Sequence, residues 1–176
     1  MRRLLSLIIA ASLLAACTTA SASGPPVHRL DEPLPLLEGD DLEGRPLSSS
    51  EFAGSVLVVN AWSTTCKPCE DETPMLVGLS ERYADDGVAF LGIDHVDFVA
   101  DAQRFVERYE VPYPSFADQA GRFAAVLGYP GLPATYVVDA GGTIRYAVLG
   151  PVTEEVLVPL IDEVLAAGAS PTPSAA

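Results

Sequence analysis

Cys66 and Cys69 are the two side chains of this 176-residue chain whose type and spacing most directly indicate chemistry. Two cysteines three positions apart at the start of a helix can close a small disulfide ring. The first sulfur then faces unpaired backbone amides and the positive end of the helix dipole. These amides favour the thiolate, which is the species that attacks a disulfide. We expect Cys66 to attack and Cys69, one turn further along the helix, to resolve the mixed disulfide.

A zinc site is the main alternative for a pair of cysteines at this spacing. A structural zinc needs about four ligands, and outside the N-terminal segment the chain adds only His28 and His95 to the two cysteines. Asp94 and Asp97 flank His95 but leave the set short of ligands. We therefore expect no metal site and no cofactor, and we interpret His95 as a polar loop residue whose role the sequence leaves open.

Strand-like and helix-like segments alternate over residues 33–167, which predicts an α/β domain with a sheet covered by helices. The run 56–61 is continuously apolar and predicts a strand buried on both faces. The cysteine pair follows it, where a helix should begin. The predicted strands are 56–61, 88–93, 135–138 and 143–149, and the predicted helices are 69–83, one from about 101, 119–127, and one from 153.

The N-terminus has the pattern of an export signal. Arg2 and Arg3 precede an apolar run over 4–14, which is shorter than the roughly 20 residues that span a membrane. Leu14-Ala15-Ala16-Cys17 resembles the bacterial lipobox, whose cysteine receives a diacylglyceryl group and becomes the first mature residue. We predict a lipoprotein signal peptide over 1–16, a flexible tether over 17–32 and a disordered tail over 168–176.

The charge balance excludes one class of partner. The chain has 24 acidic and 10 basic side chains, for a formal net charge of −14. Nucleic-acid binding needs a basic patch that neutralises phosphates, and the arginines here are scattered. Nucleic acid is therefore not an expected partner.

The sequence resembles the thioredoxin superfamily, and within it the TlpA/ResA-like membrane-attached thiol–disulfide oxidoreductases. The resemblance covers about 34–165 and rests on Val-Val-Asn-Ala-Trp at 58–62, Cys-Lys-Pro-Cys at 66–69, Pro74, and Gly-Leu-Pro-Ala-Thr at 131–135. It implies a thioredoxin-like fold: a central mixed β-sheet flanked by helices, here with a short N-terminal β extension. It also implies that Pro133 is cis and faces the dithiol, with the backbone beside it pairing with the substrate.

Two positions set the chain apart from cytoplasmic thioredoxin. Asn60 stands where thioredoxin has a buried aspartate, and an amide cannot shuttle a proton. ResA-like proteins instead carry a glutamate three residues after the second cysteine, which Glu72 matches. That carboxylate would exchange protons with Cys69 or tune the thiol pKa values. An acidic first helical turn explains Glu72 equally well, so both interpretations stay open.

Other residues are expected to surround the dithiol. Trp62 should pack around the active-site turn, and Lys67, the only lysine of the chain, brings positive charge between the cysteines. Pro68 and Leu132 complete the expected neighbours. Thr65 departs from the family, which usually has an aromatic residue just before the first cysteine, and this puts substrate preference in doubt more than chemistry.

The resemblance implies an enzyme anchored outside the cell membrane that reduces disulfides of exported proteins, such as apocytochrome c, and is itself reduced by a membrane thiol carrier. A peroxiredoxin is one alternative, but its pattern has proline seven residues before the nucleophile, where this chain has Val59. A copper-delivering protein is another, although the cysteine spacing differs from that pattern. Reducing the dithiol of a copper-delivery protein fits better than holding the metal.

Overall fold

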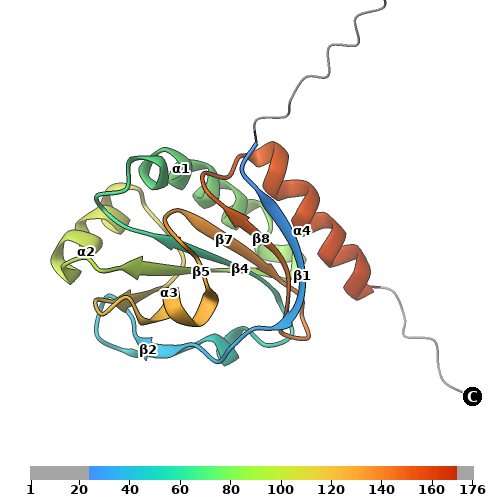
Figure 1. Cartoon of the computed structure of the whole chain (residues 1–176), viewed down its shortest axis with the longest axis horizontal. Coiled ribbons are helices and arrows are strands. Elements are labelled where there is room, and N and C mark those ends of the chain that lie inside the picture. The colour runs from blue at the N-terminus through green and yellow to red at the C-terminus, as the bar shows by residue number, and fades with distance from the viewer. Residues whose placement is uncertain (1–23, 170–176) are drawn as a thin grey trace, which may run out of the picture.

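A six-stranded mixed sheet forms the centre of the structure, a computed structural model that describes residues 24–169 (Figure 1). The strand order is β1-β8-β7-β4-β5-β6, in which β4, β5 and β6 are parallel and the other neighbours antiparallel. The strands are β1 (Val27–Pro33), β4 (Val56–Trp62), β5 (Val88–His95), β6 (Ser115–Asp118), β7 (Ala134–Val138) and β8 (Thr143–Leu149). A separate hairpin consists of β2 (Glu38–Asp40) and β3 (Pro46–Ser48).

Helices cover both faces of this sheet (Figure 1). They are α1 (Lys67–Arg82), α2 (Val99–Arg108), α3 (Arg122–Leu127) and α4 (Glu154–Ala169), with short 3-10 turns η1 (Ser49–Phe52) and η2 (Ala84–Asp86). The expected thioredoxin-like mixed sheet flanked by helices is confirmed. Within the described residues, no helix is long and apolar enough to cross a membrane.

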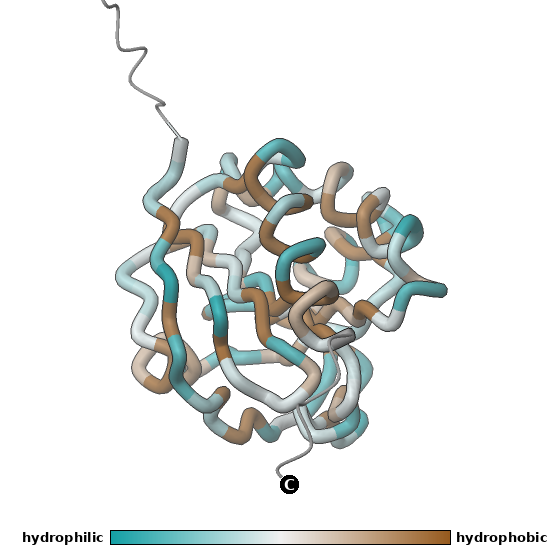
Figure 2. The backbone as a smooth tube through the Cα atoms, turned by 90° about the vertical axis from the view of Figure 1, so that its right-hand side faces the viewer, coloured by the Kyte–Doolittle hydropathy of each residue, from teal (hydrophilic) through white to brown (hydrophobic). Residues whose placement is uncertain are grey.

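Strand β4 shows why the core has two layers. Its seven residues are all buried, and alternate side chains point to opposite faces. Val56 and Val58 pack in a cluster with residues of α1 and α4, whereas Leu57 and Val59 pack on the side of α3 and the N-terminal extension. Along the helices that cover the sheet, hydrophobic and hydrophilic residues alternate (Figure 2). A strand buried on both faces is what the continuous apolar run predicted.

The structure corrects two boundaries. Residues 27–32, predicted as the end of a flexible tether, belong to β1, which pairs with β8 and is fixed by Arg29 donating to Tyr146. Its side chains are largely exposed because it is an edge strand, so it lacks the apolar pattern that marks the buried strands. The predicted tail from residue 168 is also wrong at its start, since α4 continues to Ala169.

Other differences concern short elements. Strand β6 was not predicted because it follows Pro112 and Pro114 and has only four residues. The helix predicted over 119–127 is shorter, and α1 begins at Lys67 instead of 69. The predicted signal peptide, Cys17 and the tail residues 170–176 lie outside the described residues.

Gly92 on β5 makes the fold sensitive to one added methyl group. A Cβ there would collide with Ser115 Oγ and lie 2.9 Å from Trp62 Nε1. Both neighbours are buried, so Gly92→Ala should destabilise the protein by about 1–3 kcal/mol. Gly78→Ala is the control, because no atom lies within 4 Å of its Cβ and alanine favours a helix. Urea unfolding of both variants checks this, and equal midpoints would contradict it.

Candidate active site

Cys66 and Cys69 form a disulfide where β4 gives way to α1, with a Cα–Cα distance of 5.2 Å. Cys66 is the N-cap of α1, and its Sγ accepts a hydrogen bond from the Cys69 amide at 3.2 Å. Cys66 is half-buried, whereas Cys69 is 1% exposed. The amide that the sequence predicted to face the first sulfur is therefore present, and Cys66 is the sulfur that a partner can reach.

A tight turn over 63–65 connects β4 to α1. The Cys66 amide donates to the Ser63 carbonyl at 3.1 Å, and the hydroxyls of Ser63 and Thr65 lie 3.1 Å apart. Pro68 follows within the first turn of α1, where its missing N–H removes no helical hydrogen bond. Thr65 itself is exposed, so the position that is usually aromatic in the resembling family presents a small polar side chain here.

Trp62 packs beneath the dithiol instead of facing solvent. It is 5% exposed, and its ring stacks on Phe105 of α2 with centroids 4.6 Å apart. Cys69 and Ala102 belong to the same buried cluster. This placement agrees with a packing role, because the large ring fixes α2 against the end of β4.

Lys67 is engaged by carboxylates of its own helix. Its Nζ pairs with Glu70 at 3.3 Å and also with Asp71, and the hydrogen bonds that it donates to Asp71 and Glu70 raise the pKa of the lysine. Glu70 in turn accepts a 2.6 Å hydrogen bond from the Tyr109 hydroxyl of α2. Much of the positive charge beside the sulfurs is therefore offset by neighbouring acids.

Glu72 lies at the centre of a buried hydrogen-bond network. Its Oε1 accepts from Asn60 Nδ2 at 3.0 Å and its Oε2 from the Val152 amide at 2.8 Å. The same Asn60 nitrogen donates to Thr135 Oγ1 at 3.0 Å. Burial raises the pKa of Glu72 to about 7, and the two donated hydrogen bonds oppose that rise. A solvated acidic first turn does not describe this side chain, since it is 5% exposed.

The Leu132–Pro133 peptide bond is cis, as the resemblance implied. Pro133 is buried, and its carbonyl accepts from the Gly150 amide at 2.9 Å. Leu132 packs against the same cluster that Cys66 contacts. Neither the amide nor the carbonyl of Leu132 is hydrogen bonded within the described part of the chain. These two backbone groups beside the dithiol are therefore left without a partner in the described residues.

His95 lies at the end of β5 and is half-buried. Its Nδ1 lies 3.1 Å from the Tyr129 hydroxyl, and the two rings meet edge to face. Across residues 24–169 no group of three or more His, Cys, Asp or Glu side chains is placed to hold a metal ion.

Sequence reasoning missed three contacts of this site. Asp97 accepts a hydrogen bond from the Thr64 amide in the active-site turn, Tyr109 holds Glu70, and Val152 holds Glu72. The partners are separated by 33, 39 and 80 residues, so local spacing carries no signal for them. Parallel strands β4 and β5 bring Asp94 beside Trp62 at the edge of the sheet where the dithiol lies.

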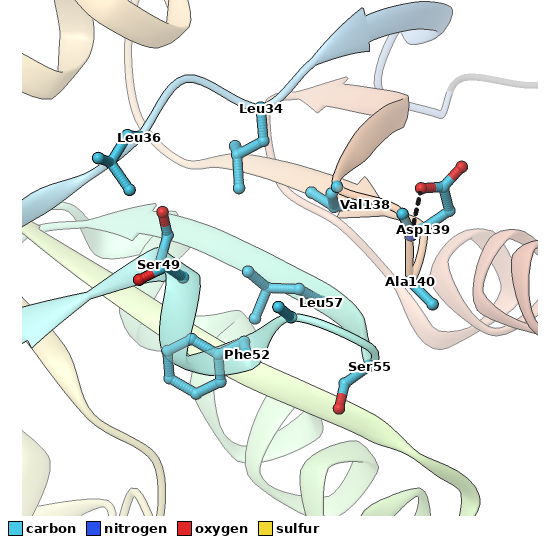
Figure 3. A pocket seen from close by; sticks show the side chains of 13 residues that line it. Leu34, Leu36, Ser49, Phe52, Ser55, Leu57, Val138, Asp139 and Ala140 are labelled. Carbon is cyan, nitrogen blue, oxygen red and sulfur yellow. Dashed lines mark hydrogen bonds between the residues drawn. The ribbon is translucent and has the colours of Figure 1, made fainter.

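A separate apolar pocket opens at the other end of β4 (Figure 3). Leu34, Phe52, Leu57 and Val138 line it. Since Leu57 is the second residue of β4 and Trp62 the last, this pocket lies at the opposite edge of the sheet from Cys66. It takes no part in the dithiol site.

Comparison with known proteins agrees with this geometry. The AhpC/TSA family matches residues 30–147. Thiol-disulfide oxidoreductase ResA of Bacillus thuringiensis subsp. konkukian is 31% identical over 117 residues, covering 66% of this chain and 68% of ResA. Thiol:disulfide interchange protein HelX of Rhodobacter capsulatus is 36% identical over 114 residues, covering 64% of this chain and 62% of HelX.

Solved structures have the same fold. A DsbF homologue from Corynebacterium diphtheriae superposes with a TM-score of 0.73 at 30% identity, covering 81% of this chain and 96% of the homologue. A putative thiol:disulfide interchange protein DsbE from Chlorobium tepidum gives a TM-score of 0.73 at 20% identity, covering 77% of this chain and 97% of its own.

Glu72 should give the oxidised protein a pH-dependent stability. Its pKa is about 7 when folded and 4.5 as the reference value, so the folded state holds a proton that the unfolded state releases between these values. Stability should fall as pH rises through this window, by roughly 3 kcal/mol for a shift of this size. Glu72→Gln keeps the shape, with Asn60 turning its amide to match, and should remove that part of the slope.

Urea unfolding of oxidised wild type and Glu72→Gln at intervals from pH 4.5 to 7.5 measures the difference. Glu70→Gln is the matched control, because it removes an acid of the same helix turn whose pKa is lowered by Tyr109 and Lys67. Parallel stability curves for wild type and Glu72→Gln would show that Glu72 is ionised throughout.

Proposed function

This chain belongs to the AhpC/TSA family and is a thiol-disulfide oxidoreductase of the ResA, HelX and DsbE type, and on that premise we propose that it reduces disulfides of exported proteins outside the cytoplasm. One observation carries the proposal most directly. The Cys66–Cys69 disulfide has one half-buried and one buried sulfur at a helix N-terminus. This arrangement supports dithiol exchange over a peroxidase reaction, in which a single nucleophilic cysteine attacks a peroxide.

The proposed cycle begins with the reduced dithiol. The Cys66 thiolate attacks one sulfur of a substrate disulfide, and the other substrate sulfur leaves as a thiolate that takes up a proton. Cys69 then loses its proton and attacks Cys66 Sγ, which releases the second substrate thiol and closes the Cys66–Cys69 disulfide. A dithiol carrier of the membrane restores the enzyme and becomes a disulfide. Each step exchanges one sulfur–sulfur bond for another.

Glu72 is proposed as the group that exchanges a proton with Cys69. The two residues lie three positions apart on α1, which places them on the same face of the helix. A carboxyl with a pKa of about 7 can take or give a proton near neutral pH. Asn60 cannot do this, and its role is to hold the carboxylate by donating to Oε1.

Leu132 and Pro133 are proposed to orient the substrate. The free amide and carbonyl of Leu132 can pair with an extended peptide in the manner of an added strand. Trp62, Lys67 and Pro68 then act through packing, charge and helix initiation rather than by contact with the reacting sulfurs. The preferred substrate class is an unfolded or extended exported chain with a disulfide, such as an apocytochrome c.

Anchoring through Cys17 is the last part of the proposal. The sequence over 14–17 resembles a lipobox, and two acyl chains on Cys17 would supply stable anchoring that one chain does not. The mature domain would then act at the outer face of the cell membrane. Strand β1 begins at Val27, so a connection of about ten residues would join the lipid to the folded domain.

The reduction potential tests the direction of electron flow. A reductant should equilibrate with glutathione at a potential near that of thioredoxin, roughly −270 mV, and an oxidant near −120 mV. Cys66→Ser is the control, because it cannot form the intramolecular disulfide. Cys69→Ser should in contrast accumulate mixed disulfides with substrate at Cys66. A value near −120 mV would overturn the proposed direction, and absence of any Cys66–Cys69 redox couple would overturn the proposed reaction.

Lipid labelling tests the anchor. In cells fed a radioactive fatty acid, the wild-type chain should be labelled and Cys17→Ala should not, since no other thiol occupies the lipobox position. Cys66→Ser serves as the matched control and should remain labelled. A wild-type chain without label would contradict the anchoring proposal and would leave the redox proposal unaffected.

A further inference from the structure

Asp94 is a buried acid that the dithiol cycle does not use. It is 0% exposed, and neither of its oxygens receives a hydrogen bond from any donor in residues 24–169. No described basic side chain pairs with it or acts on its pKa. An ionised carboxylate without donors is strongly disfavoured in such a place. The site therefore favours the neutral acid, whose hydroxyl needs an acceptor.

Asp97 supplies that acceptor. Its side chain lies within hydrogen-bonding reach of Asp94. Two carboxyl groups so near each other can form a hydrogen bond only if one of them carries a proton. Between them the chain turns at Val96, which has a left-handed φ of 61°. That conformation is rare for a β-branched residue. This bend follows β5 directly and leaves Asp97 beside Asp94, three residues earlier in the chain.

The pair reaches the active site through Asp97. Its Oδ2 accepts a hydrogen bond from the Thr64 amide, two residues before Cys66. Asp94 pairs in register with Trp62, the last residue of β4, and with Ala117 of β6. Successive residues of a strand point to opposite faces, so Asp94 shares its face of the sheet with Gly92 and with the neighbouring Trp62 and Asn60. The pair thus lies behind the turn that presents the nucleophile.

We propose that Asp94 and Asp97 share one proton, and that this pair positions the active-site turn of residues 63–65 that carries Cys66. Asp94 acts as the donor, and Asp97 joins it to the Thr64 amide. The proposal adds positioning residues to the dithiol exchange described above and rests on that function only for its consequence at Cys66. Loss of the shared proton places two carboxylates in contact, loosens the Thr64 amide and adds negative charge near the Cys66 thiolate.

The pH at which this happens follows from the surroundings. Burial, together with the nearby acids Asp97 and Asp118, raises the pKa of Asp94 to about 8. Asp97 lies in the segment before α2, and β4 presents the uncharged Trp62. On β6 the residue in register with Asp94 is Ala117, and the charge of Asp118, the next residue, acts on Asp94 through space. The pair should therefore hold one proton at neutral pH and lose it only in mildly alkaline solution.

Amide and carboxyl NMR tests the pair directly in full-length protein carrying Cys17→Ala, which also removes the third thiol. The Thr64 amide resonance should shift with a midpoint near pH 8, together with the Asp94 side-chain carbon. In Asp94→Asn the side-chain amide donates to Asp97 at every pH, so the Thr64 step should vanish. In Asp97→Asn the new amide donates to Asp94, which should then be ionised at pH 7. An Asp94 already ionised at pH 7 in the parent would overturn the proposal.

Alkylation of the reduced dithiol tests the consequence at Cys66. Parent and Asp94→Asn should react equally below pH 7, and above pH 8 the parent should fall behind by roughly threefold as the added charge disfavours the thiolate. Asp101→Asn is the charge-matched control on the first turn of α2 and should follow the parent throughout. Superimposable pH profiles of parent and Asp94→Asn would show that the pair does not position Cys66. Neither readout depends on the natural substrate or direction of electron flow, so its failure is distinct from failure of the proposed function.

Discussion

The arrangement of the site depends on the hydrogen bonds that the buried carboxyl group of Glu72 accepts. It joins α1, which carries the cysteines, to Asn60 of β4 and to the Val152 amide just before α4. Asn60 extends the connection to Thr135, two residues after the cis proline. Four segments that are distant in sequence are thereby held at fixed separations around one acid. A buried polar group of this kind is stable only when its partners are in place, so the network also selects a single packing of these segments.

The topology explains why such polar contacts gather at one end of the molecule. Strands β4 and β5 are parallel, and Trp62, the last residue of β4, lies in register with Asp94 near the end of β5. Ligand and active sites of α/β sheets lie beyond the carboxyl ends of parallel strands, where loops are free of the ladder. Antiparallel β7 contributes the cis proline at its N-terminal end, which reaches the same edge because its direction is reversed. The apolar pocket around Leu57 lies at the opposite end.

The sequence predicted those parts of the fold that local pattern determines. The continuous apolar run over 56–61 predicted the central strand, and the Cys66–Cys69 spacing predicted the disulfide, because both signals are local. Strand β1 was missed because an exposed edge strand lacks a buried face, and β6 because it is short and follows prolines. The Glu72 partners and the Asp97–Thr64 contact depend on tertiary packing. The sequence drew attention to Glu72 and Asp97 as acidic residues, but only the fold determines which amide groups donate hydrogen bonds to them.

The electrostatics of the site bear on the direction of electron flow. A strongly oxidising dithiol is one whose reduced form is stabilised, and the usual source is stabilisation of the first thiolate. Here the Cys69 amide and the helix N-terminus favour the Cys66 thiolate. The Lys67 charge, however, is offset by Glu70 and Asp71. Glu72 brings no positive charge, and any ionisation of it works against a nearby thiolate. With stabilisation limited to backbone dipoles, the disulfide form is comparatively favoured, which is the property expected of a reductant.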